Sequence, residues 1–243
     1  MRLCPAFSGA PIRRLPIEHT FAYGRPVALA ALPRRDERSR EHLDNAARHA
    51  RPVVLAGERV LAVPGPLSEL LPGGAVQRGT VAVIDGDPGA GATGVAFQLA
   101  AAATAAGEWA AAVELDATLG GLAAGEAGVE LDRFAVVRRV PPARWAAVVA
   151  ALLDGISVVV AEVPVFARIG DARRLLARTR ERGAVLVAIG PWPAEAALRL
   201  RAGGSLWRGL DLGAGMLAGR DQRVHVDGRG VAAREQVALV EAG

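Results

Sequence analysis

The chain has 243 residues, 51% of them hydrophobic, and a formal net charge of +4 at neutral pH, an excess that permits nucleic-acid contact without requiring it. This length suits one α/β domain with an appendage, and the absence of any uninterrupted apolar stretch of about 18 residues excludes a membrane span. Cys4 is the only cysteine, which excludes an intrachain disulfide, and the first residues lack the apolar region of a secretory signal, so we expect a cytoplasmic protein.

The N-terminal part is predicted to lie outside the main core. Residues 1–35 carry five prolines and little periodicity, so we predict an irregular arm. Residues 36–75 are predicted to form a second segment, with a charged helix over 36–50 and a short hairpin over 52–63. The core is predicted to occupy residues 76–243.

Strand and helix patterns alternate at short spacing through most of the core. Apolar runs typical of buried strands occupy residues 80–84, 109–115, 134–137, 156–161 and 184–189. Helices are predicted over residues 91–106, 118–126, 141–154 and 171–182. This alternation predicts an α/β fold whose central sheet is doubly wound and mostly parallel.

The pattern changes after Pro191. We predict a short helix over 194–201 and then two strands, over 223–226 and 236–240, separated by an Asp227–Gly228 turn. These C-terminal strands are expected to be antiparallel and to lie at one edge of the parallel sheet.

A glycine-rich loop between the first core strand and its helix is the strongest motif. Gly86, Gly89, Gly91 and Thr93 fit the P-loop pattern G-x-x-x-x-G-K-[ST], but Ala92 takes the place of the lysine that reaches the phosphates. No other lysine can substitute, because all 29 basic residues are arginine. We therefore expect no bound cofactor and no metal, and we interpret the loop as a strand-to-helix turn that no longer binds ATP.

The segments at residues 71–79 and 111–116 resemble the corresponding parts of RecA-type recombinases. The similarity is good over residues 60–190 and loose in the antiparallel tail, and it implies a RecA-like core. The resemblance also identifies which catalytic groups have been lost. Ala161 stands where the family has the Walker B acid, with Glu162 one place late and on the other side of the strand.

Further departures affect the groups that would act on ATP. Asp116 stands where the family has its catalytic glutamate, and Pro191–Trp192 replaces a glutamine that senses the nucleotide. Phosphoryl transfer uses a phosphate cation, a Mg²⁺ carboxylate and a group that positions the attacking water. Their joint loss predicts a pseudo-ATPase rather than an enzyme, with Glu114 and Asp116 left as remnants or as partners for arginines.

A RecA-like core with an erased nucleotide site resembles the ImuA-type accessory proteins, above all their shorter actinobacterial form. This resemblance implies a role in DNA repair: an SOS-induced factor of error-prone translesion synthesis and mutagenesis after DNA damage. It also implies binding to an ImuB-like inactive Y-family polymerase homologue, and through it indirect contact with the sliding clamp and a specialised C-family DNA polymerase. Two alternatives stay open: a SulA-like cell-division inhibitor, and a divergent DNA-dependent ATPase of the RecA class completed by a neighbour's arginine.

Candidate binding residues lie on predicted surfaces. Trp207, Arg208 and Leu210 are the candidates for partner binding, because exposed aromatic and arginine side chains dominate protein interfaces. The alternative is that Trp207 packs beneath the edge of the sheet. A weak DNA contact is expected of the arginines on the helix over 171–182, unless they are simply solvated there: Arg173, Arg174, Arg178, Arg180 and Arg182.

Overall fold

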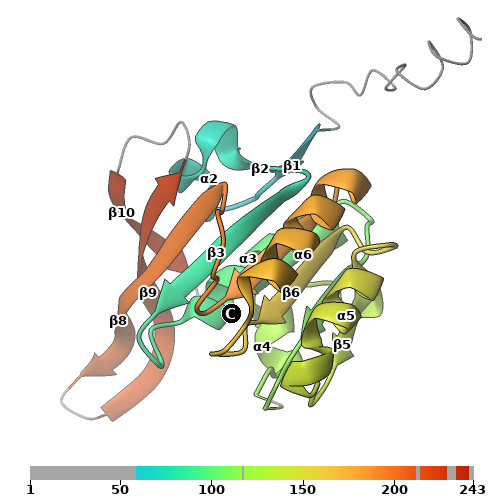
Figure 1. The fold of residues 1–243 in the computed structure, drawn as a ribbon. Helices are drawn as coiled ribbons and strands as arrows, with labels where there is room; N and C mark the ends of the chain where they lie inside the picture. Colours follow the sequence, from blue (N-terminus) through green and yellow to red (C-terminus); the bar gives the residue numbers. More distant parts are fainter. Residues whose placement is uncertain (1–58, 117, 212–213, 229–233, 241–243) are drawn as a thin grey trace, which may run out of the picture. The chain divides into compact units, whose positions relative to one another are not determined.

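An eight-stranded sheet forms the centre of this computed structural model, which describes residues 59–116, 118–211, 214–228 and 234–240. All of these residues belong to one unit of the chain, residues 53–243. The strand order across the sheet is β10-β9-β8-β3-β7-β6-β4-β5 (Figure 1). The arm predicted over 1–35 and the helix predicted over 36–50 lie outside the described residues.

Six neighbouring strands of the sheet are parallel: β3 (Thr80–Gly86), β4 (Ala110–Val113), β5 (Phe134–Val137), β6 (Val158–Glu162), β7 (Val185–Ile189) and β8 (Leu198–Asp211). The central strands β3, β4, β6 and β7 consist mainly of valine, alanine, leucine and isoleucine, and most of these residues are buried. Such continuous apolar runs form parallel strands because helices cover both faces of the sheet.

Helices pack on both faces of this sheet and create two hydrophobic cores. The helices of the unit are α2 (Leu67–Leu70), α3 (Ala92–Ala105), α4 (Gly121–Glu126), α5 (Pro142–Leu152) and α6 (Ile169–Arg182), with short 3₁₀ turns at Pro72–Gly74 and Leu131–Arg133. In β6, Val158 and Val160 join the core beneath α3, whereas Val159 and Ala161 join the core beneath α5 and α6 (Figure 1). The predicted doubly wound fold is confirmed, and it is consistent with a RecA-like core.

The residues before the core form a small sheet of their own. β1 (Val60–Ala62) pairs antiparallel with β2 (Ala75–Gln77), and α2 lies between them in the sequence. The hairpin predicted over 52–63 has its first half outside the described residues. None of the helices in the described part of the chain has the length and apolar character needed to cross a membrane.

The helix predicted over 194–201 is wrong, because this segment leads directly into β8. Leu198, Leu200 and Ala202 are buried while Arg199 and Arg201 are exposed, which is the alternation of a strand with one buried face. β8 pairs parallel with β3 on one side and antiparallel with β9 on the other.

The predicted antiparallel edge is confirmed, but its strands are longer than expected. β9 (Ala214–Gly228) includes the Asp227–Gly228 pair that was predicted to be a turn, and β10 (Arg234–Val240) pairs antiparallel with β9. The longer β9 matters for the site, because it brings residues before 223 alongside β8.

Replacing Trp145 with alanine is expected to lower the free energy of unfolding by about 3–5 kcal/mol, the cost of removing a buried aromatic side chain. Trp145 is 2% exposed and its ring packs edge-to-face on Trp192 at 6.5 Å between centroids. Trp109→Ala is the control, because Trp109 is 49% exposed and should lose less than about 1 kcal/mol. Urea unfolding followed by circular dichroism measures both, and equal losses would contradict the proposed core.

Candidate functional site

The glycine loop has the strand–loop–helix geometry predicted from the sequence. β3 ends at Gly86, and α3 begins at Ala92 with Thr93 as its second residue. Within the loop, Gly89 has φ +80° and the Ala90 amide donates to the Asp87 carbonyl at 2.9 Å. The loop therefore keeps the shape of a phosphate-binding turn, although the position of the cation is held by a methyl group.

Two side chains from β9 reach the glycine loop. The Gln222 amide nitrogen donates to the carbonyl oxygen of Ala90, and it also donates to the Gly203 carbonyl at 3.0 Å. A guanidinium nitrogen of Arg220 lies 3.4 Å from the same Ala90 oxygen. Gln222 is only 2% exposed, so its amide acts as a buried tie between the loop and the antiparallel edge of the sheet.

Gly91 is the residue that allows this close approach. Its φ of +94° is in the left-handed region, which favours glycine. A Cβ at this position would lie 1.9 Å from the Arg220 guanidinium and 2.2 Å from the Gln222 amide oxygen. The loop and β9 are thus fitted to each other through a residue without a side chain.

Arg220 places a cation beside the glycine loop, which has Ala92 where the P-loop pattern has a lysine. Its Nε donates to the Ser205 hydroxyl at 2.8 Å, and a terminal nitrogen donates to the Gln222 amide oxygen. The guanidinium lies over the Trp207 ring, 5.3 Å from the centroid, as in a cation–π contact. Partial burial lowers the pKa of Arg220 below its ordinary value, but that value is so high that the group stays charged at neutral pH.

Sequence reasoning missed Arg220 and Gln222. Ser205 pairs with Gln222 and Trp207 with Arg220 in the β8–β9 register, so all four side chains share one face of the sheet. The strand predicted over 223–226 stopped short of both residues. Had the sequence predicted a longer strand, the spacing of two would have placed Arg220 and Gln222 on the same face. It would still not have shown that this face meets the glycine loop.

The carboxylates at the ends of β4 and β6, Glu114 and Glu162, accept hydrogen bonds from backbone amides. Glu114 is fully buried, accepts from the Leu119 amide at 2.9 Å and lies 3.4 Å from Nε of Arg138. Glu162 accepts from the Leu115 amide at 2.7 Å and from the Thr118 hydroxyl at 3.0 Å. Both carboxylates therefore brace the segment that follows β4.

Two further positions that the sequence comparison with RecA-type proteins singled out are Ala161 and Asp116. Ala161 is fully buried in the core under α5 and α6, on the opposite side of β6 from Glu162, as predicted. Asp116 is exposed beyond the end of β4. Within the described ranges, no three His, Cys, Asp or Glu side chains gather in a way that could hold a metal ion.

The candidate partner residues all lie in β8, not in a segment outside the sheet. Trp207 is 47% exposed on the face of the glycine loop, where it contacts Arg220. Arg208 is on the opposite face and forms an ion pair with Asp221 at 3.1 Å. Leu210 pairs with Gly215 in the β8–β9 register. Trp207 is thus linked to the glycine loop through Arg220, whereas Arg208 lies on the other face of the sheet.

The five arginines of α6 fall into two groups. Three form ion pairs: Arg174 with Asp171 at 2.5 Å, Arg178 with Asp154 at 2.5 Å, and Arg182 with Asp154 at 3.1 Å. The hydrogen bond from Arg178 lowers the pKa of the Asp154 carboxyl below its ordinary value of 3.8.

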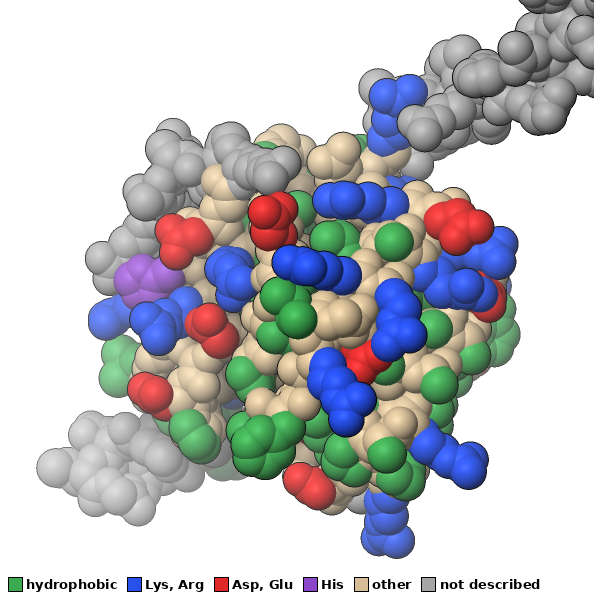
Figure 2. Space-filling view, viewed as in Figure 1, with side chains coloured by type: hydrophobic (Ala, Val, Ile, Leu, Met, Phe, Trp, Pro, Cys, Tyr) green, Lys and Arg blue, Asp and Glu red, His purple; other side chains and the backbone are tan. Residues whose placement is uncertain are grey.

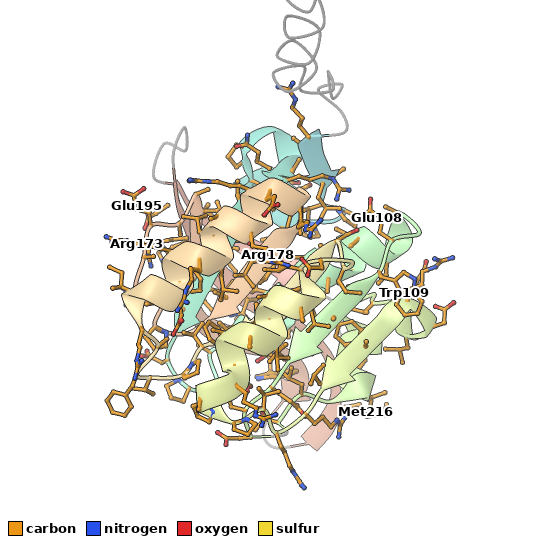
Figure 3. All side chains as sticks on the ribbon, turned by 45° about the vertical axis from the view of Figure 1, so that its right-hand side comes forward. Glu108, Trp109, Arg173, Arg178, Glu195 and Met216 are labelled. Carbon is orange, nitrogen blue, oxygen red and sulfur yellow. The ribbon has the colours of Figure 1, made fainter. Side chains whose placement is uncertain are left out.

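The other two α6 arginines, Arg173 and Arg180, line a cavity beside α6. Figure 3 shows Arg178 on the side of α6 that faces α5 and Arg173 on the other side. The basic patch predicted for α6 is therefore divided: three arginines form ion pairs on one side of the helix, and two line the cavity on the other.

Gly91→Ala is expected to destabilise the protein by at least about 1–3 kcal/mol, because it adds backbone strain and a clash with the β9 side chains. Gly94→Ala in the same helix is the control: a Cβ there meets nothing within 4 Å, and it should be neutral or stabilising by up to about 1 kcal/mol. Combining Gly91→Ala with Arg220→Ala should recover part of the loss in urea unfolding. No recovery would show that Arg220 does not abut the loop.

The comparison with known families matches the part of the chain that contains this site. A family model described as the MT3502 N-terminal domain matches residues 69–194, from α2 to the segment before β8, and so includes the glycine loop, Glu114 and Glu162. No curated protein is similar enough to match the chain. The match spans more than half of the 243 residues, and the chain belongs to the MT3502 N-terminal domain family.

Proposed function

We propose that the protein is a non-catalytic accessory protein of an error-prone translesion DNA synthesis complex. In this proposal it acts as a scaffold of the SOS-induced mutasome and binds a catalytically inactive Y-family polymerase homologue. The resemblance of a RecA-like core with an erased nucleotide site to the ImuA-type proteins suggests this role, and the mostly parallel sheet with an antiparallel edge is compatible with it.

The observation that carries the proposal is that the glycine loop is hydrogen-bonded to a buried side chain of its own chain, Gln222. Phosphoryl transfer needs a cation on the phosphates and a carboxylate for Mg²⁺. Ala92 and Ala161 supply neither, and the nearby Glu162 already accepts two hydrogen bonds from its own chain. The Ala90 carbonyl is bonded to the buried Gln222, which favours a loop that serves as structure.

Exposed apolar side chains on the β8–β9 ladder support a role in binding. Leu206, Trp207 and Met216 are 68%, 47% and 85% exposed. Large apolar groups at this exposure are typical of surfaces that a partner covers, and tryptophan is among the residues most enriched in binding hot spots. We place the contact with the polymerase homologue on this ladder.

One observation favours a second candidate, the divergent DNA-dependent ATPase. Arg220 lies beside the glycine loop and could turn toward a phosphate in place of the missing lysine. To do so it would give up its hydrogen bonds to Ser205 and Gln222 and its contact with Trp207. The non-catalytic proposal requires none of these changes.

Nucleotide binding separates the two candidates. Calorimetric titration with Mg-ATP, paired with a hydrolysis assay in the presence of single-stranded DNA, is expected to show neither binding nor turnover. Micromolar binding or turnover that both Thr93→Ala and Arg220→Ala remove would establish the ATPase and overturn the proposal. Gly94→Ala is the matched control in the same helix, because its Cβ would meet nothing.

Trp207→Ala is expected to weaken co-purification with the polymerase homologue at least about tenfold, the effect of losing a hot-spot aromatic. It should also lower damage-induced mutagenesis when it replaces the wild-type gene. Trp109→Ala is the matched control, since Trp109 has almost the same exposure, 49% against 47%, but lies at the far side of the sheet (Figure 3). A homologue that fails to co-purify with the wild-type protein would refute the assigned partner.

A further inference from the structure

A groove runs along α6 on the side that faces away from α5. Two adjoining cavities of about 620 and 640 Å³ form it, one beside the start of β3 and one beside the N-terminal half of α6. The residues that line both cavities are Leu176, Arg180, Glu195 and Ala196. Because they share this boundary, we treat the two cavities as one continuous groove, called the α6 groove below.

The α6 groove has an apolar lining and a basic rim. Its apolar residues include Val60, Pro72, Leu176, Pro193, Ala196 and Leu198, and its open arginines are Arg59, Arg173, Arg180 and Arg199. Glu195 is the carboxylate among the lining residues. Figure 2 shows arginine side chains interspersed with hydrophobic ones over this face of the molecule, and Figure 3 shows Arg173 and Glu195 at the same edge of α6.

The four arginines of this rim outnumber the carboxylates among the described lining residues, where Glu195 is the one carboxylate. Arg174, Arg178 and Arg182 form ion pairs on the other side of the helix. Arg199 donates to the Ala194 carbonyl at 3.3 Å. Arg78 also lines the groove but is paired with Glu108 at 2.5 Å, so we leave it out of the rim.

We propose that the α6 groove binds an acidic linear segment of a partner protein, in which Asp or Glu residues are interspersed with small apolar ones. Carboxylates of such a segment would meet the arginine rim, since opposite charge across an interface sets specificity and register. Its apolar side chains would cover the leucine, proline and alanine of the lining. The inference rests on the proposed scaffold function and names the chemistry of the partner segment.

A protein segment fits this groove better than single-stranded nucleic acid. Sites for single strands combine arginines with aromatic rings on which successive bases stack. The residues that line the two cavities include no aromatic side chain. Phe166 is 94% exposed in the loop before α6, but one ring does not make a row of stacking positions.

The test uses the full-length protein and a short fluorescein-labelled peptide in which glutamates alternate with alanine and leucine. We expect fluorescence anisotropy to show saturable binding that is lost when glutamine replaces each glutamate. Arg173→Glu with Arg180→Glu should weaken binding at least about tenfold, because two attractive charges become repulsive.

Arg174→Glu with Arg182→Glu is the control pair, since it makes the same change of charge on the other side of α6, and it should weaken binding no more than about twofold. Ala196→Trp fills the groove without a change of charge and should also abolish binding. Circular dichroism verifies that each variant is folded before its binding is compared.

Three results would overturn the proposal. The first is that the wild-type protein does not bind the acidic peptide, and the second is that both arginine pairs weaken binding equally. The third is that oligothymidine binds more tightly than the peptide and is lost with the Arg173/Arg180 pair. If the wild-type protein co-purifies with the Y-family homologue, whose contact we place on the β8–β9 ladder, but does not bind the peptide, the groove is refuted and the scaffold function stays intact. If the peptide binds but the homologue does not co-purify, the groove proposal stands and the scaffold function is refuted.

Discussion

The hydrogen bond from the Gln222 amide to the Ala90 carbonyl is the constraint on which the architecture of this site depends. A buried amide that lost its partners would carry the cost of unsatisfied polar groups, and Gln222 is 2% exposed. It can reach the loop only because Gly91 has no side chain. The antiparallel edge and the glycine loop are therefore one unit, and a change in either is transmitted to the other.

Carboxylates at the ends of the neighbouring strands β4 and β6 also fix backbone segments. A fully buried carboxylate such as Glu114 is tolerated only when it is paired or hydrogen-bonded, and it has both Arg138 and the Leu119 amide. Glu162 is fixed by Leu115 and Thr118. Together the two carboxylates hold the segment after β4 in place.

The parallel part of the fold could be predicted because its strands are continuous apolar runs and its helices end at glycines. The start of β8 could not be identified so easily, since Leu198, Leu200 and Ala202 alternate with polar residues but also include helix formers, and only pairing with β3 decides between strand and helix. The loop itself was evident from its spacing, whereas Arg220 was not. Its position follows from the β8–β9 register, which no local pattern specifies.

The arginines of α6 show why composition alone could not locate a binding surface. Residues 174, 178 and 182 recur at the helical spacing of four, so they share one side of α6. Arg178 and Arg182 bind Asp154 just after α5, whereas Arg174 pairs with Asp171 of the same helix. Residues 173 and 180 are seven apart and share the side that borders the groove. On either side of α6, the planar guanidinium of an arginine can bind a carboxylate. The two sides differ in how many carboxylates the protein itself places beside the arginines. On the groove side the described lining holds four open arginines and one carboxylate, Glu195, which is why an acidic partner, rather than another helix of this protein, is the complement we assign to it.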